Sequence, residues 1–307
     1  MKSRGMWWDP TTARFRSLTR MFQLSLTISL MCVLFATSAN AAPFVYVVAT
    51  DKQFNPQFGT IDLVTGKFQA IGNGTSDLLS NLVWWKDGSL RTLTTFPTLG
   101  SLAKIDPATG TENVIGPTGL GFNAFDLAEV RGKLYLTDFG NNPLPQNLYS
   151  VDQGSGVARL PMSTGVPFDP NIPLTFNSDG TFNLSDEGLL GIGGKLYATF
   201  DSFAIDPTQT PPTRVHEDVR PRLYEIDPFT GATSVIAPTD WSLTAIFEAE
   251  GKVYAFRGVA DGFNWSVGLP IGHSELVRLD LKTGRTNKVA DIDPSLGLIF
   301  GAVPVRR

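Results

Sequence analysis

The sequence contains few of the residues on which disulfide and catalytic chemistry depend. It holds one cysteine, Cys32, and two histidines, His216 and His273. A single cysteine excludes a disulfide within the chain, and any general-base histidine has to be one of these two. The chain also lacks the G-x-S-x-G, H-E-x-x-H and P-loop motifs. Nucleophile-elbow hydrolases, zincin metalloproteases and P-loop nucleotide hydrolases are therefore not indicated.

Charge is also scarce, because Asp, Glu, Lys and Arg make up 18% of the chain against 42% hydrophobic residues. Disordered chains combine high charge with few apolar residues, so this balance indicates a folded protein. No apolar run is long enough to indicate a membrane span without a competing explanation.

The first forty residues have the three-part layout of a secretory signal. Basic residues from Lys2 to Arg20 precede an apolar stretch over 21–36, and Ala39-Asn40-Ala41 follows as an A-x-A cleavage site. We therefore expect a signal peptide at 1–41, a secreted or periplasmic protein, and no membrane span after cleavage. An uncleaved N-terminal membrane anchor is the alternative.

Cleavage would leave residues 42–307 acidic and without cysteine. Basic residues fall from 25 to 20 and acidic residues from 29 to 28, which gives a net charge of −8. Nucleic acid requires a basic face, so this net charge argues against it and no nucleic-acid partner is expected. With no thiol, a single domain over 42–307 has to be stabilised by a large apolar core.

One pattern recurs along the whole remaining chain. An apolar residue is followed by Asp, two variable residues, Thr or Ser, and Gly; the copies lie at 61–66, 105–110, 151–156, 226–231 and 279–284. The Asp side chain can accept backbone N–H bonds within a turn, and Gly supplies the positive φ that starts a returning strand. Each copy therefore predicts a β-hairpin.

A second pattern precedes the first and completes a four-stranded unit. Gly-Lys-Leu-Tyr, or a close variant, occurs at 132–135, 194–197 and 251–254, with a weaker copy at 88–91. We name the four strands of a unit A to D, with the first pattern between C and D. Four short strands per unit are typical of a propeller blade. We predict an all-β fold, a five-bladed β-propeller, with six blades as the alternative.

The two ends of the chain predict how the ring closes. Residues 44–50 form a B strand with no A strand before it, and residues 298–305 form a lone apolar strand after the last D strand. Placing the C-terminal strand inside the first blade leaves no open edge between the first and last blades.

Strand alternation places the long connections on one rim. The A–B and C–D turns are short, whereas the long segments are all B–C or D–A connections, at 139–146, 161–185, 202–221 and 259–274. Variable loops on a rigid scaffold commonly carry binding or catalysis, so we predict a cleft or lid over blades 4 and 5. Insertions without function are the alternative.

The predicted rim supplies the candidate functional residues. The binding candidates are Asp138, Asn142, Asp218, Arg220, Arg257, Trp265 and His273. The catalytic candidates are Glu187 and His216, which could move a proton. At the mouth of the channel, Asn81, Asn123, Asp126 and Glu187 could together hold a divalent cation such as Ca²⁺ through oxygen ligands.

The repeats resemble those of secreted bacterial propellers. The segments 148–152 (LYSVD) and 223–231 (LYEIDPFTG) are similar to blades of the YVTN and quinoprotein-like repeat groups. The resemblance implies a propeller and does not imply one activity. Quinoproteins dock their cofactor with recurring tryptophans, which this chain lacks, so that cofactor is not expected. Lactonase-type propellers, which hold a metal at the channel mouth, resemble the chain only in architecture.

The sequence thus favours an exported, monomeric scaffold that binds a small molecule, glycan or extracellular protein through the rim over blades 4 and 5. No cofactor is expected for this function. The alternative is a metal-assisted, lactonase-like hydrolase or lyase that uses the channel-mouth residues and a divalent cation.

Overall fold

The structure is a computed structural model that describes residues 43–96, 100–121, 124–138, 146–165, 182–239, 243–264 and 269–306. The chain divides into Met1–Ala42 and Pro43–Arg307, and all described residues belong to the second part. They form β-strands and no α-helix. Within these ranges there is accordingly no helix with the length and hydropathy needed to cross a membrane.

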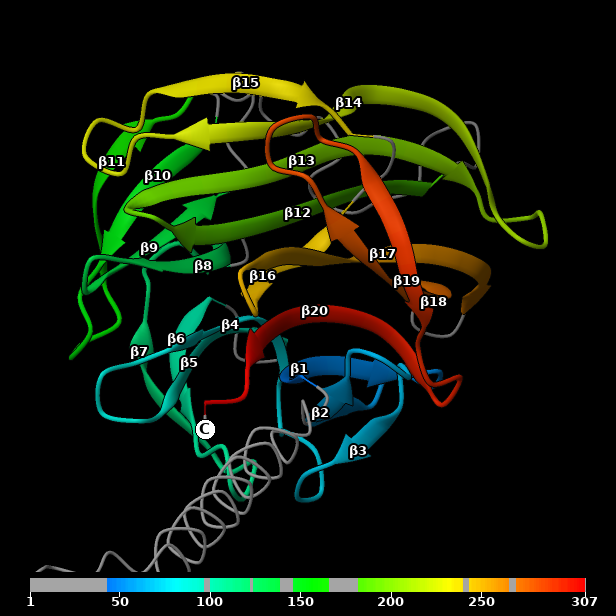
Figure 1. Ribbon diagram of the computed structural model, residues 1–307, viewed down its shortest axis with the longest axis horizontal. Helices are drawn as coiled ribbons and strands as arrows, with labels where there is room; N and C mark the ends of the chain where they lie inside the picture. The colour runs from blue at the N-terminus through cyan, green and yellow to red at the C-terminus, as the bar shows by residue number, and fades with distance from the viewer. Residues whose placement is uncertain are drawn as a thin grey trace, which may run out of the picture. The chain divides into compact units, whose positions relative to one another are not determined.

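The strands form five four-stranded antiparallel sheets, which are the five blades of a β-propeller (Figure 1). From inside to outside, blade 1 contains β20 (Leu296–Pro304), β1 (Phe44–Asp51), β2 (Pro56–Asp62) and β3 (Phe68–Ala70). Blade 2 contains β4 (Leu78–Trp84), β5 (Leu90–Phe96), β6 (Ser101–Ile105) and β7 (Glu112–Pro117). Blade 3 contains β8 (Ala124–Val130), β9 (Lys133–Asp138), β10 (Asn147–Val151) and β11 (Ala158–Ser163). Blade 4 contains β12 (Phe182–Ile192), β13 (Lys195–Asp206), β14 (Thr213–Ile226) and β15 (Thr233–Pro238). Blade 5 contains β16 (Thr244–Ala249), β17 (Lys252–Asn264), β18 (Leu269–Leu279) and β19 (Thr286–Asp291).

The predicted ring closure is confirmed. β20 pairs antiparallel with β1, with Val47 opposite Ala302 and Val45 opposite Pro304. In Figure 1 the red C-terminal strand lies beside the blue N-terminal strand in the same sheet. The last strand of the chain is therefore the innermost strand of the first blade, so the first and last blades share no open edge.

The predicted Asp-to-Gly hairpins are also confirmed, and each joins strands C and D of its blade. In blade 4, Oδ1 of Asp227 accepts the backbone N–H groups of Phe229 at 2.7 Å and Thr230 at 3.2 Å. The N–H of Gly231 donates to the carbonyl of Asp227 at 2.8 Å, and Gly231 has φ 74°. The other four copies also end in a glycine with positive φ, at Gly66, Gly110, Gly156 and Gly284.

These turn glycines also lie against the neighbouring blade. A methyl group on Gly66 would overlap the carbonyl oxygen of Asp291 at the end of β19, and one on Gly284 would overlap that of Pro238 at the end of β15. Gly110, Gly156 and Gly231 approach Ile71, Gly116 and Met162 of the preceding blade in the same way. The glycine thus meets two requirements at once, a left-handed backbone and close contact between blades.

The hydrophobic core lies between the blades. Five clusters each join two neighbouring blades; in the one between blades 1 and 5, Val47 and Ile299 pack with Phe256, all with 2% or less of their surface exposed. Inner strands such as β1 and β4 have runs of consecutive buried residues, because both faces of a blade meet a neighbour. A sixth, small cluster of Phe200 and Tyr224 lies within blade 4. Among the described residues, most of the core is therefore shared between blades, which stabilise one another.

The structure differs from the sequence prediction in the long connections of blades 4 and 5. The predicted loops at 202–221 and 259–274 continue largely as strands, so that β13–β14 and β17–β18 are extended hairpins. β13 has 12 residues and β17 has 13, against 7 for the equivalent β5. At about 3.3 Å per residue, the surplus extends each hairpin by roughly 17–20 Å. We name the rim that carries these B–C hairpins the hairpin rim and the opposite one, with the A–B turns, the turn rim.

Candidate functional site

The structure does not describe the side chains of several candidate residues. Asn123, Asn142 and Trp265 lie outside the described residues. For a second group the structure gives the strand position and no description of the side chain; it comprises Glu187 in β12 and His216, Asp218 and Arg220 in β14.

The strand register separates the two catalytic candidates. Glu187 is opposite Phe200 on β13, whereas His216 is opposite Ala204 on the other side of β13. Their main-chain positions are thus two strands and four residues apart, or about 16 Å at the usual strand spacing and rise. The fold does not place these two backbone positions side by side.

Asp138 forms hydrogen bonds within its own blade. It is 1% exposed at the end of β9, and its carboxylate accepts the backbone N–H of Asn147 at 2.7 Å and the Tyr149 hydroxyl at 2.9 Å. Burial, together with the adjacent charge of Asp138, raises the pKa of Tyr149 well above its ordinary value. These hydrogen bonds connect β10 to β9. The side chain of Asp138, a predicted binding residue, thus links two strands of its own blade.

Arg257 occupies the equivalent place in blade 5 and belongs to a charge network. Its guanidinium donates to Oε2 of Glu275 on β18, and Nε lies 2.7 Å from that oxygen. Lys288 on β19 donates to Oε1 of Glu275 at 2.7 Å. The Glu275 side chain is only 10% exposed. Three strands of blade 5 therefore meet at one buried carboxylate.

This network makes stability depend on pH. Burial tends to raise the pKa of Glu275, but the hydrogen bonds and charges of Lys288 and Arg257 outweigh it and hold the pKa below its ordinary value. The resulting stabilisation is complete above the unfolded-state pKa of about 4.3 and is lost as the pH falls through the lower folded-state pKa.

We therefore expect Glu275→Gln to lower the melting temperature most near neutral pH, with the difference from the wild type shrinking below about pH 4. Thermal unfolding followed by circular dichroism between pH 7 and pH 3 measures this difference. A gap that stays constant over the whole range would contradict the role of the Glu275 charge.

The hairpin of blade 5 brings one histidine to a carboxylate. Nδ1 of His273 on β18 lies 2.7 Å from Oδ2 of Asp261 on β17, and their side chains are 37% and 48% exposed. The pair stands on the extended part of the hairpin. It is the clearest polar feature that the described residues add to the hairpin rim.

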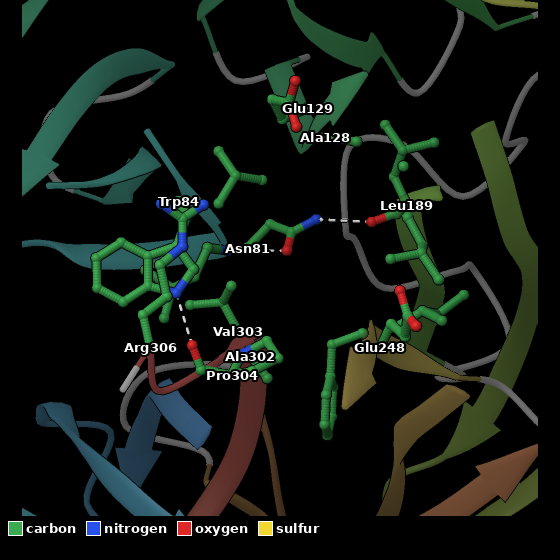
Figure 2. A pocket seen from close by; sticks show the side chains of 16 residues that line it. Asn81, Trp84, Ala128, Glu129, Leu189, Glu248, Ala302, Val303, Pro304 and Arg306 are labelled. Carbon is green, nitrogen blue, oxygen red and sulfur yellow. Dashed lines mark hydrogen bonds between the residues drawn. The ribbon is translucent and has the colours of Figure 1, made fainter. Parts of the chain in front are cut away.

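Two of the four metal candidates in the channel, Asn81 and Asp126, have described side chains, and both are buried. Asn81 on β4 is 1% exposed and has φ 52°. Its Nδ2 donates across the channel to the carbonyl of Leu189 on β12 at 3.2 Å, and its Oδ1 accepts the N–H of Leu82 at 2.8 Å (Figure 2). Asp126, on β8, is 1% exposed. Among the described residues, no group of three or more His, Cys, Asp or Glu is placed to hold a metal ion.

A cavity of about 270 Å³ lies in the channel, toward the turn rim. It is lined by the C-terminal halves of the innermost strands of all five blades, β4, β8, β12, β16 and β20. One residue from each blade forms its outer layer, and these residues occupy equivalent register positions: Trp84, Glu129, Gly191, Glu248 and Pro304. Two residues earlier in four of the strands lies an apolar inner layer of Leu82, Leu189, Ile246 and Ala302.

The outer layer contains the Trp84 indole, held by a hydrogen bond, and the carboxylates of Glu129 and Glu248. The indole N–H of Trp84 donates to the carbonyl of Pro304 at 2.6 Å, and the Arg306 guanidinium lies 4.8 Å from the centre of the indole ring. Glu129 accepts the N–H of Gly132, whereas Glu248 is exposed. Figure 2 shows Glu129 and Glu248 on different sides of the Asn81 side chain.

Of the residues that line the cavity, Asn81 is among the sequence candidates, whereas the outer-layer residues are not. The sequence nevertheless contains a signal for two of the outer-layer residues. Glu129 and Glu248 each stand three residues before the glycine of the Gly-Lys-Leu-Tyr pattern, at Gly132 and Gly251. Once the pattern is placed at the A–B turn, that spacing puts both glutamates in the same layer of the channel.

Comparison with known proteins gives no family assignment. No family model matches the chain, and no curated protein matches it significantly. The likeness of the repeats to YVTN and quinoprotein-like blades therefore stays a resemblance.

Proposed function

We propose that the protein is an exported binding module that holds a partner protein on the extended hairpins of blades 4 and 5. The propeller fold, which can serve as a binding scaffold, is the basis of this proposal. The observation that carries it is the extension of two neighbouring blades on the same rim. Elements that project from a rigid scaffold are where binding surfaces usually lie.

The strand edges of the hairpins suggest how a protein would bind. β15 pairs only with Arg222–Ile226, and Thr239 just beyond it donates its N–H to the Pro221 carbonyl. The outer edge of β14 from Thr213 to Arg220 has no partner among the described strands. β19 likewise pairs only with Glu275–Leu279 of β18 and leaves the edge of Leu269–Ser274 open in the described part. Open edges present main-chain N–H and C=O groups that an extended peptide can pair with.

The proposal is tested by photocrosslinking in the native host. A photoreactive residue at Val215, which is 49% exposed on the open edge of β14, is expected to give a specific adduct with another protein. Val114 is the matched control, because it is 50% exposed and lies on β7, an ordinary outermost strand away from the hairpins. The absence of a protein adduct at Val215, or equal adducts at both positions, would contradict the proposal.

The same preparation reports on export. We expect the crosslinked protein outside the cytoplasm, with a mature chain that begins at Ala42 by mass spectrometry. Recovery of the uncleaved chain from the cytoplasm would refute export and leave the binding result to be judged separately.

A further inference from the structure

We propose that the channel cavity on the turn rim is a binding site for a small organic cation, an ammonium group on a short hydrocarbon body. This site is at the opposite end of the channel from the extended hairpins. It is therefore independent of the proposed partner-binding function, and either can fail without the other.

The two layers of the cavity match the two parts of such a ligand. Glu129 and Glu248 place carboxylates in the outer layer, and the inner layer beneath them is apolar. Ligand pockets generally combine an apolar wall with a few polar groups that fix orientation. A volume of about 270 Å³ suits a ligand of few heavy atoms.

Blade 4 lies between the blades of the two glutamates and contributes no side chain to the outer layer. Glu129 belongs to blade 3 and Glu248 to blade 5, and the equivalent position of blade 4 is Gly191. A methyl group on Gly191 would overlap the main-chain carbonyl of Glu129, so the glycine allows β12 to approach β8 closely. Glu129 and Glu248 are the only carboxylates among the described residues that line the cavity.

One cationic side chain of the protein already lies at the cavity. Arg306, two residues beyond β20, lines the cavity with its guanidinium over the Trp84 ring. Attraction between a cation and an aromatic face supports this position. The formal charge of Glu129, Glu248 and Arg306 together is still −1, so the lining favours a further positive charge over an anion.

The ligand class follows from these contacts. An ammonium group would donate hydrogen bonds to one or both carboxylates while its hydrocarbon part contacts Leu189 and Ile246. A ligand with ammonium groups at both ends could engage both glutamates. We therefore expect 1,4-diaminobutane to bind more tightly than n-butylamine, and the anion butyrate not to bind.

The test is isothermal titration of the full chain with these three probes at low ionic strength. Glu129→Gln and Glu248→Gln are each expected to weaken the binding of diaminobutane about tenfold, because each removes one charge-assisted contact and keeps the side-chain shape. The double variant is expected to show no measurable binding. Gln at position 129 can still accept the Gly132 N–H, so folding is expected to be retained, and circular dichroism verifies this.

Glu250→Gln is the matched control, since Glu250 is exposed in the neighbouring A–B turn and does not line the cavity. It is expected to bind diaminobutane as the wild type does. Absence of saturable binding to the wild type, equal weakening by Glu250→Gln, or unchanged binding in the double variant would each overturn the proposal. Binding of butyrate in place of the amines would overturn the assigned charge of the ligand.

Discussion

A chain that ends at Ser295 is expected to lose the folded state altogether. The missing strand, β20, provides the innermost pairing of blade 1 and carries Leu296, Ile299 and Ala302, each with 2% or less of its surface exposed. Its removal opens the edge of β1 and exposes the core between blades 1 and 5. This loss is comparable with the whole stability of a domain, about 5–15 kcal/mol. Circular dichroism and gel filtration would show unfolded or aggregated protein.

A chain that ends at Val305 is the control for this truncation. It retains β20 and the bond from the N–H of Val305 to the carbonyl of Phe44 at 2.9 Å. We expect its melting temperature to remain within a few degrees of the wild type. A cooperative, monomeric unfolding transition in the chain that ends at Ser295 would contradict the role assigned to β20.

The second large effect is expected from Gly66→Ala at the junction of blades 1 and 5. Gly66 has φ 70°, so a side chain adds roughly 1–2 kcal/mol of backbone strain. Its methyl group would also overlap the Asp291 carbonyl, and overpacking of this kind costs about 1–3 kcal/mol more. We expect a total destabilisation of about 3 kcal/mol, measured by urea unfolding.

Gly88→Ala separates these two contributions. Gly88 has φ 79°, and no atom lies within 4 Å of the position that its methyl group would take. The variant therefore has backbone strain without contact between blades, and we expect it to lose only about 1–2 kcal/mol. Equal losses in the two variants would show that the close approach of blade 1 to blade 5 contributes nothing.

The architecture was predictable because each blade encodes it locally. Asp227 and Gly231 form their hairpin through bonds within five residues, and the same chemistry recurs in every blade. Repetition of a local signal at propeller spacing leaves few alternative folds. The closing strand was predictable for a related reason, since blade 1 lacked one strand and the C-terminus supplied one.

The candidate site was less predictable because it depends on contacts between distant segments. Asp138 and Arg257 are predicted binding residues, and the structure shows them hydrogen-bonded to Tyr149 and Glu275 on the next strands. In the sequences of the extended hairpins, apolar and polar residues do not alternate regularly enough to distinguish strands from loops. The cavity arises only when the ring closes and brings five inner strands together, so no single segment of the sequence reveals it.

The most direct test of the closed ring is a disulfide between β1 and β20. Val47 and Ala302 are opposite each other, and opposite residues of antiparallel strands have the Cα separation that a disulfide requires. In a Cys32→Ala background, Val47→Cys with Ala302→Cys is expected to oxidise to a closed loop that migrates faster in a denaturing gel. Val47→Cys with Val303→Cys places the thiols on opposite faces of the sheet and should not form this species. Failure of the first pair to crosslink, or equal crosslinking of both pairs, would contradict the closure of the propeller by its C-terminal strand.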